Sequence, residues 1–263
     1  MSNQLTPLQI YLSPKKIAKF FGLVVLTLVL ANIAVIISRY ILGYPNLKGI
    51  VPLFLLRREN NIPSTYSSFA LLFCSVVIGI IAIAKQQRKD RYTVHWQGLS
   101  LIFLYLSFDE AASLHELTSD LVRMVINTGG FLRHAWVIVG ITFVSIFLVA
   151  YRKFIISLPA KTRNLFILAG TSYVGGVIAM EMIGGWYADG QGYDNLIYSL
   201  LTTIEETLEM LGIVIFIYAL LEYMTSHLSS MQIHLQNKSP SKKIEIQESQ
   251  LNNSLKALED FEL

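Results

Sequence analysis

The sequence has a single cysteine and few charged residues, and each shortage excludes a class of protein. Cys74 is the only cysteine among 263 residues, so neither an intramolecular disulfide nor a cysteine-based metal site can form. Charged residues make up 15% of the chain, whereas soluble domains usually carry about 25%. With 53% hydrophobic residues and a mean hydropathy of +0.51, the composition favours a membrane protein.

Several short motifs of enzymes and binding proteins are also missing. The chain has no nucleophile elbow of the Ser-His-Asp hydrolases, no glycine-rich phosphate loop and no basic patch typical of nucleic-acid binding. The strict alternation of apolar and polar residues that predicts β-strands is absent, because the apolar runs are continuous. We therefore expect an all-α protein that does not bind nucleic acid.

Long apolar runs dominate what is present. A membrane-spanning helix needs about 20 predominantly apolar residues. The first run follows three lysines but is too long for the apolar part of a signal peptide, so we expect it to be retained. The sequence thus predicts a polytopic membrane helical bundle over residues 1–225, in contact with the lipid bilayer. About six helices are expected, at residues 17–43, 66–85, 97–116, 132–151, 164–186 and 197–223.

The basic residues are divided unequally between alternate loops. Fifteen of the 21 lysines and arginines lie on one side of the predicted bundle, and six lie on the other. Cytoplasmic loops carry an excess of these residues. We therefore expect a multi-pass protein of the inner (plasma) membrane with both termini in the cytoplasm.

The polar segment 226–263 is expected to be a cytoplasmic tail, partly disordered. Its end, LNNSLKALEDFEL, spaces Leu251, Leu255 and Leu258 like one face of a short amphipathic helix. Two interpretations stay open: a flexible tail with a surface helix, or a helix that docks on a membrane protein partner.

Ionisable residues interrupt the apolar windows where lipid would disfavour them. The stretch SFDEAASLHE, residues 107–116, ends the third window, and TTIEETLEM opens the sixth. In the predicted topology these groups share the outer half of the bilayer. They are Asp109, Glu110, His115, Glu116, Glu181, Glu205, Glu206 and Glu209, with His134 at the start of the fourth helix and with Arg39, Arg57 and Glu59 close by.

Helical geometry predicts which of these groups meet. At about 100° per residue, Asp109 and Glu116 fall within about 60° of arc, and His115 points elsewhere. Glu205, Glu206 and Glu209 share an arc of about 100° on the sixth helix. Both polar stripes should face the interior of the bundle, since charge in lipid is costly.

A metal site is one interpretation of these residues. Carboxylates and histidines on bundle helices hold the metals of di-iron and di-manganese proteins, although their Glu-x-x-His pairs are not matched here. A divalent metal or such a dinuclear centre would support chemistry on a lipophilic substrate. The expected ligands are Glu110, His115, Glu116, Glu181, Glu206 and Glu209.

Two further interpretations need no metal. Carboxylates inside a membrane commonly mark proton or cation paths, so the chain could be a proton- or cation-coupled transporter. Alternatively, paired polar groups and small residues hold helices together in a structural or accessory protein. The sequence leaves open which of the three holds, and with it whether the protein is an enzyme.

Two segments resemble an uncharacterised bacterial family of multi-pass membrane proteins. One is the E-x-x-I-P-x-x-Y-S pattern formed by Glu59, Ile62, Pro63, Tyr66 and Ser67. The other is the DE-x-x-x-x-HE pattern of residues 109–116. The resemblance covers about a tenth of the chain. It implies a membrane helical bundle, and it gives no indication of an activity.

Overall fold

The computed structural model describes residues 13–228, and these residues form helices with no β-strand. The predicted tail helix lies outside them. A π-helical segment, Gly175–Met180, joins α7 to α8. The helices are α1 (Pro14–Tyr40), α2 (Ile50–Phe54), α3 (Ile62–Gln87), α4 (Thr93–Ala112), α5 (Leu114–Arg123), α6 (Trp136–Ser157), α7 (Ala160–Val174), α8 (Glu181–Gln191) and α9 (Leu196–His227).

The all-α membrane fold is confirmed, although not with six equal spans. Within residues 13–228, four helical stretches are long and apolar enough to cross a membrane: α1, α3, α6 and the continuous stretch Ala160–Gln191. The third and sixth predicted windows are helical too, as α4 and α9, but they carry the carboxylates. The structure adds two short helices, α2 and α5, in the connections.

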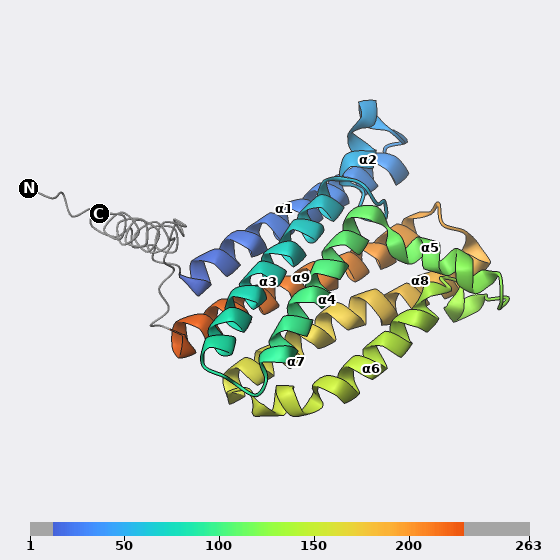
Figure 1. Cartoon of the computed structure of the whole chain (residues 1–263). Coiled ribbons are helices and arrows are strands. Elements are labelled where there is room, and N and C mark those ends of the chain that lie inside the picture. The colour runs from blue at the N-terminus through green and yellow to red at the C-terminus, as the bar shows by residue number, and fades with distance from the viewer. Residues whose placement is uncertain (1–12, 229–263) are drawn as a thin grey trace, which may run out of the picture. The chain divides into compact units, whose positions relative to one another are not determined.

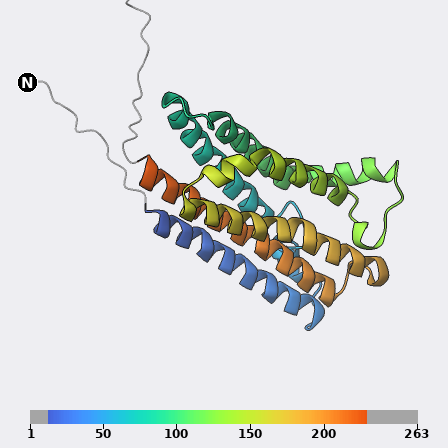
Figure 2. The same ribbon diagram turned by 90° about the horizontal axis from the view of Figure 1, so that it is seen from below.

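The long helix α9 lies at the centre of the bundle. It packs against α1, α3, α7 and α8, while α4 packs along α3 and α6 lies at the margin beside α7 (Figures 1 and 2). We call one end of the bundle the turn end, because it carries the short connections 88–92 and 158–159. The opposite end, with α2, α5 and the α8–α9 connection, is the loop end.

Glycines let α7 and α9 approach closely. A Cβ added to Gly212 of α9 would lie 2.8 Å from the backbone nitrogen of Tyr173 and 2.9 Å from the carbonyl oxygen of Ala169. One added to Gly176 would lie 2.8 Å from the carbonyl oxygen of Glu205. Such contacts between small residues are how helices associate in lipid, where apolar surface alone gives no driving force.

Serine pairs join α3 to α4. The hydroxyl of Ser75 donates to the carbonyl of Ser100 over 2.8 Å, and that of Ser100 donates to the carbonyl of Ser75 over 2.9 Å. Ser68 and Ser107 repeat the exchange two turns nearer the loop end. Each buried hydroxyl therefore has a partner in the neighbouring helix.

The buried amide of Asn32 connects three segments at the loop end. It is 0% exposed. Its Nδ2 donates to the hydroxyl of Thr203 in α9 over 2.8 Å, and the backbone N–H of Leu56, which follows α2, donates to its Oδ1 over 3.0 Å. One side chain of α1 thus holds both α9 and the chain entering α3.

Substituting Asn32 should destabilise the bundle. Asn32→Ala leaves the buried backbone N–H of Leu56 without its acceptor, which costs about 1–3 kcal/mol, and it removes a hydrogen bond to Thr203, whose hydroxyl still donates to Ser199. We expect a lower Tm in detergent for Asn32→Ala and an unchanged Tm for Asn46→Ala, because Asn46 is exposed and makes no side-chain cap bond. Equal losses in the two variants would contradict this role for Asn32.

Candidate functional site

Most of the ionisable residues found in the sequence lie on segments that meet at the loop end. Glu59 is in the α2–α3 connection, Asp109 and Glu110 end α4, and His115 begins α5. Glu181 begins α8, directly after the π-helical segment. We call the five glutamates on these helices the acidic cluster: Glu110, Glu181, Glu205, Glu206 and Glu209.

His115 is held between two carboxylates. Its Nδ1 lies 3.2 Å from Asp109 and its Nε2 lies 3.1 Å from Glu59, and its backbone N–H donates to Asp109 over 2.7 Å. Ionised carboxylates only accept hydrogen bonds, so both imidazole nitrogens carry protons. Burial disfavours the charge, but Asp109 and Glu59 outweigh it and raise the pKa of His115 to about 10.

This arrangement corrects the predicted third helix. We expected one helix over 97–116 that turns His115 away from Asp109, but α4 ends at Ala112 and Ser113 adopts left-handed φ/ψ angles of 54° and 43°. The break reverses the chain locally, so that His115 folds back onto Asp109. Glu116 lies exposed in the first turn of α5 and leaves the predicted stripe.

A second polar group surrounds Glu181. Its Oε1 accepts from the indole N–H of Trp136 and lies 3.1 Å from Nδ1 of His134. The ring of Trp136 in turn packs against the ring of His115, with 5.2 Å between centroids. Gly185 makes room for His134, since a Cβ there would lie 3.0 Å from the imidazole. Trp136 therefore links the two histidine groups.

Glu205 has no donor for its buried oxygen. The residue is 8% exposed, and its Oε2 is buried with no hydrogen-bond partner in the described structure. The group that acts most strongly on it is another carboxyl, Glu181, followed by Glu209 and Glu206. An ionised carboxylate without a donor is very costly to bury, so this group is stable there only as the neutral acid or beside a bound cation.

The remaining cluster members lie within electrostatic reach of one another. Glu206 lies within electrostatic range of Glu110 and Glu181, and Glu209 lies within range of Glu206 and Glu110. The helix face that carries Glu205 and Glu209 packs directly on Gly176. The acidic cluster therefore spans the contact between α4, the π-helical segment and α9.

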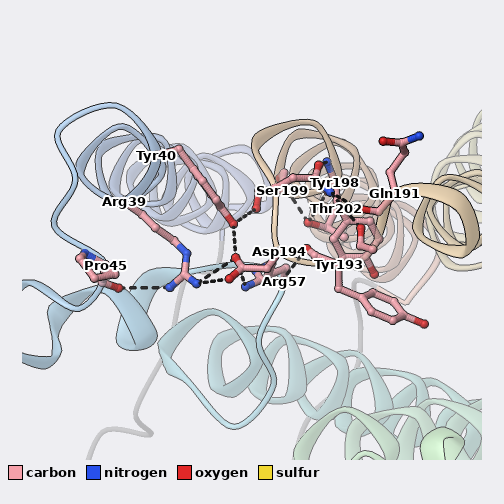
Figure 3. A network of polar contacts seen from close by, with 12 residues as sticks. Arg39, Tyr40, Pro45, Arg57, Gln191, Tyr193, Asp194, Tyr198, Ser199 and Thr202 are labelled. Atoms are coloured by element: carbon pink, nitrogen blue, oxygen red, sulfur yellow. Dashed lines mark hydrogen bonds and ion pairs between the residues drawn. The ribbon is translucent and has the colours of Figure 1, made fainter.

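The two expected arginine partners are engaged elsewhere. Both form ion pairs with Asp194, in the α8–α9 connection (Figure 3). Arg39 donates to both Asp194 oxygens over 2.9 Å, and Arg57 lies 3.3 Å from Oδ1. Tyr40 also donates to Asp194 and accepts a hydrogen bond from Ser199. The Arg39 guanidinium holds the pKa of Asp194 below its usual value.

The acidic cluster consequently lacks compensating cations. Within residues 13–228, no ion pair joins its five carboxyls to a lysine or arginine. His115 is paired with Asp109 and Glu59, which are not cluster members. Among the described residues, His134 is therefore the one histidine paired with a cluster member. Five carboxyls against one histidine cannot all be ionised in a buried site without a bound cation.

Several residues of the loop end were not found from the sequence. Asp189 binds the backbone N–H of Gly130 and the Arg133 guanidinium, each over 3.0 Å. Asp194, Tyr40 and the π-helical segment were missed as well. Asp189, near the end of α8, and Asp194, in the α8–α9 connection, stand in a stretch without basic residues, opposite arginines from other parts of the loop end, and this complementarity was the available signal.

The predicted metal ligands do not form a metal centre. In the part of the chain that the structure describes, no three His, Cys, Asp or Glu side chains are placed to hold a metal ion. Both nitrogens of His115 face carboxylates, so neither has a lone pair to donate, and Glu116 is exposed. The residues present therefore do not fit the expected divalent or dinuclear site.

Comparison with known proteins gives a family. A family model described as a domain of unknown function, DUF8692, matches residues 18–223. No curated protein and no solved structure gave a significant match. The match includes the loop connections and every member of the acidic cluster. Because it covers well over half of the chain, this protein belongs to the DUF8692 family.

Proposed function

We propose that the protein is a proton-coupled membrane transporter: its acidic cluster binds protons on one side of the membrane and, after a conformational change that proceeds even without a second substrate, releases them on the other. The observation that carries this proposal is Glu205, a buried carboxyl with no donor, beside four further carboxyls that no lysine or arginine pairs with. Groups in this state take up and release protons when their surroundings change. Intramembrane carboxylates with this property are typical of proton-coupled carriers.

The distribution of carboxyls along α9 favours a carrier over an open proton channel. Between Glu209 and Glu222 the helix has no carboxyl in 12 residues, and the two carboxyls are separated by about 20 Å of rise. A fixed proton wire would need titratable groups or ordered water along that distance. Conformational change that exposes one site alternately to each side does not need them.

The orientation of the site follows from the loop charges. The turn end carries most of the basic residues, which supports a cytoplasmic turn end and an acidic cluster open to the outer side of the plasma membrane. The segments at 59–67 and 109–116 resemble a bacterial group of membrane proteins. We therefore infer that this transport takes place across a bacterial plasma membrane.

Proton flux into liposomes tests the proposal. Purified full-length protein is reconstituted with a pH-sensitive dye inside, and a potassium diffusion potential is applied. We expect luminal acidification above that of protein-free liposomes, and loss of this difference in Glu205→Gln. Gln is isosteric with the neutral acid, so the variant should fold. Glu222→Gln, the same substitution on α9 in the carboxyl that Lys161 pairs with, should keep the flux.

A structural or accessory role is the second candidate. The clamp of Arg39 and Arg57 on Asp194 favours it, because that clamp ties the end of α1 to the α2–α3 and α8–α9 connections (Figure 3). Wild-type liposomes without flux, combined with a lower Tm in Glu205→Gln, would replace the transport proposal by this one. Metal at a fixed stoichiometry, lost in Glu110→Gln and Glu206→Gln, would contradict both.

A further inference from the structure

An open cleft of about 470 Å³ lies at the turn end, far along the bundle from the acidic cluster. It is bounded by the α3–α4 turn on one side and by the α6–α7 turn on the other. Its volume falls in the range of small-molecule sites, about 300–1,000 Å³. Nothing in the proposed transport uses it.

The floor of this turn-end cleft is aromatic. Trp96 is 1% exposed, and its ring meets the edge of Phe154 at 5.0 Å and the tilted ring of Tyr223 at 5.2 Å. Leu158 and Pro159, from the α6–α7 turn, complete an apolar wall. The floor would therefore accept the apolar part of a ligand.

The rim of the cleft is basic. Lys85 lies 2.8 Å from Asp90, whose other oxygen accepts the backbone N–H of Tyr92. The exposed Arg91 stacks on the Tyr92 ring at 4.6 Å, and it has no carboxylate partner within residues 13–228. Two cations and one carboxylate give the rim a net charge of +1 (2 − 1), with the Arg91 donors free to bind an anion.

We propose that the turn-end cleft binds the headgroup of a monoanionic phospholipid. Arg91 and Lys85 would bind the phosphate, and the glycerol portion would lie over Phe154 and Tyr223. The cleft lies where helix ends meet the headgroup layer, and basic pockets between membrane helices at the cytoplasmic side recognise anionic lipids. The net charge of the rim matches one phosphodiester.

The adjacent surface of α6 fits the acyl chains of that lipid. A second groove of about 210 Å³ runs along this helix, lined mainly by apolar and aromatic residues that include Phe147, Tyr151 and Ile155. Two further residues of its lining, Leu148 and Ile156, are 62% and 67% exposed. The cleft is too small for a whole two-chain lipid, and this surface offers the place for the chains outside it.

Binding of a short-chain lipid tests the assignment. The full-length protein in detergent is titrated calorimetrically with dihexanoyl phosphatidylglycerol, dihexanoyl phosphatidylcholine and glycerol 3-phosphate. We expect saturable binding of the phosphatidylglycerol and none of the phosphatidylcholine. Loss of one charge-assisted contact in Arg91→Gln should weaken that binding by about tenfold.

Lys89→Gln is the matched control, because it removes one positive charge from the same turn without lining the cleft. Its affinity for the phosphatidylglycerol should stay that of the wild type. Equal weakening in Lys89→Gln and Arg91→Gln would overturn the site in favour of diffuse surface charge. Equal affinity for both lipids, or binding of glycerol 3-phosphate as tight as that of the phosphatidylglycerol, would overturn the lipid assignment.

Discussion

Gly212→Ala is expected to separate α7 from α9 and to lower the stability of the bundle strongly. The new Cβ would lie 2.8 Å from the Tyr173 nitrogen and 2.9 Å from the Ala169 oxygen, and these are backbone atoms that no rotamer change moves. Overpacking of this kind costs about 1–3 kcal/mol, and more where backbone must shift. We expect a Tm several degrees below that of the wild type in the same detergent.

Gly170→Ala is the matched control for this substitution. It lies in α7, and a Cβ there meets nothing within 4 Å. Ala is favoured over Gly in a helix by about 1 kcal/mol, so this variant should be unchanged or more stable. If both variants lowered the Tm equally, close packing at Gly212 would not be the cause. Because Gly176 packs on Glu205, separation of the helices should also disturb the acidic cluster.

His115→Gln is expected to remove a pH dependence of stability that the wild type shows. The pKa of His115 is raised from 6.5 to about 10 in the folded protein. The folded state therefore binds the proton more tightly than the unfolded state. The stabilisation of the folded protein by protonated His115 is fully present below pH 6.5 and is lost as the pH rises to about 10. After discounting for partial exposure, we expect a contribution on the order of 2 kcal/mol.

The measurement is Tm against pH from 6 to 10 for the wild type and the variant. The difference should be largest at pH 6 and should close toward pH 10. His227→Gln removes an exposed histidine at the end of α9 and should leave the wild-type curve in place. A difference between wild type and His115→Gln that is constant over this range would show that Asp109 and Glu59 do not hold a charged imidazole.

Much of the fold follows from the sequence, because long apolar runs determine helices whatever their neighbours are. Each of the six predicted windows is helical in the structure, although the third ends at Ala112 and the fifth is divided into α7, the π-helical segment and α8. Asn61 with Ser64 caps the start of α3. The break at Ser113 was not predictable in this way. Serine rarely adopts left-handed angles, and the ion pairs of His115 that hold the chain there form only in the folded protein.

The sequence indicated that the acidic residues gather at one end of the bundle, but it did not indicate which of them pair. The depth shared by Glu181, Glu205 and Glu209 follows from topology and helical rise. Which groups meet depends on the packing of one helix on another, and the sequence alone does not give it. Arg39 and Arg57 were expected near the carboxyls of the helices, but Asp194 is close enough to bind both.

The π-helical segment Gly175–Met180 has a consequence for how Glu181 is aimed. Hydrogen bonds in a π-helix span five residues instead of four, so the segment takes up one more residue than an α-helix would. One residue corresponds to about 100° of rotation about the helix axis. Backbone length within these six residues, and not the choice of side chain, sets the direction of Glu181 toward Trp136 and His134. A deletion there would act as a rotation of the carboxyl away from its partners, with the chemistry of every residue in the site left unchanged.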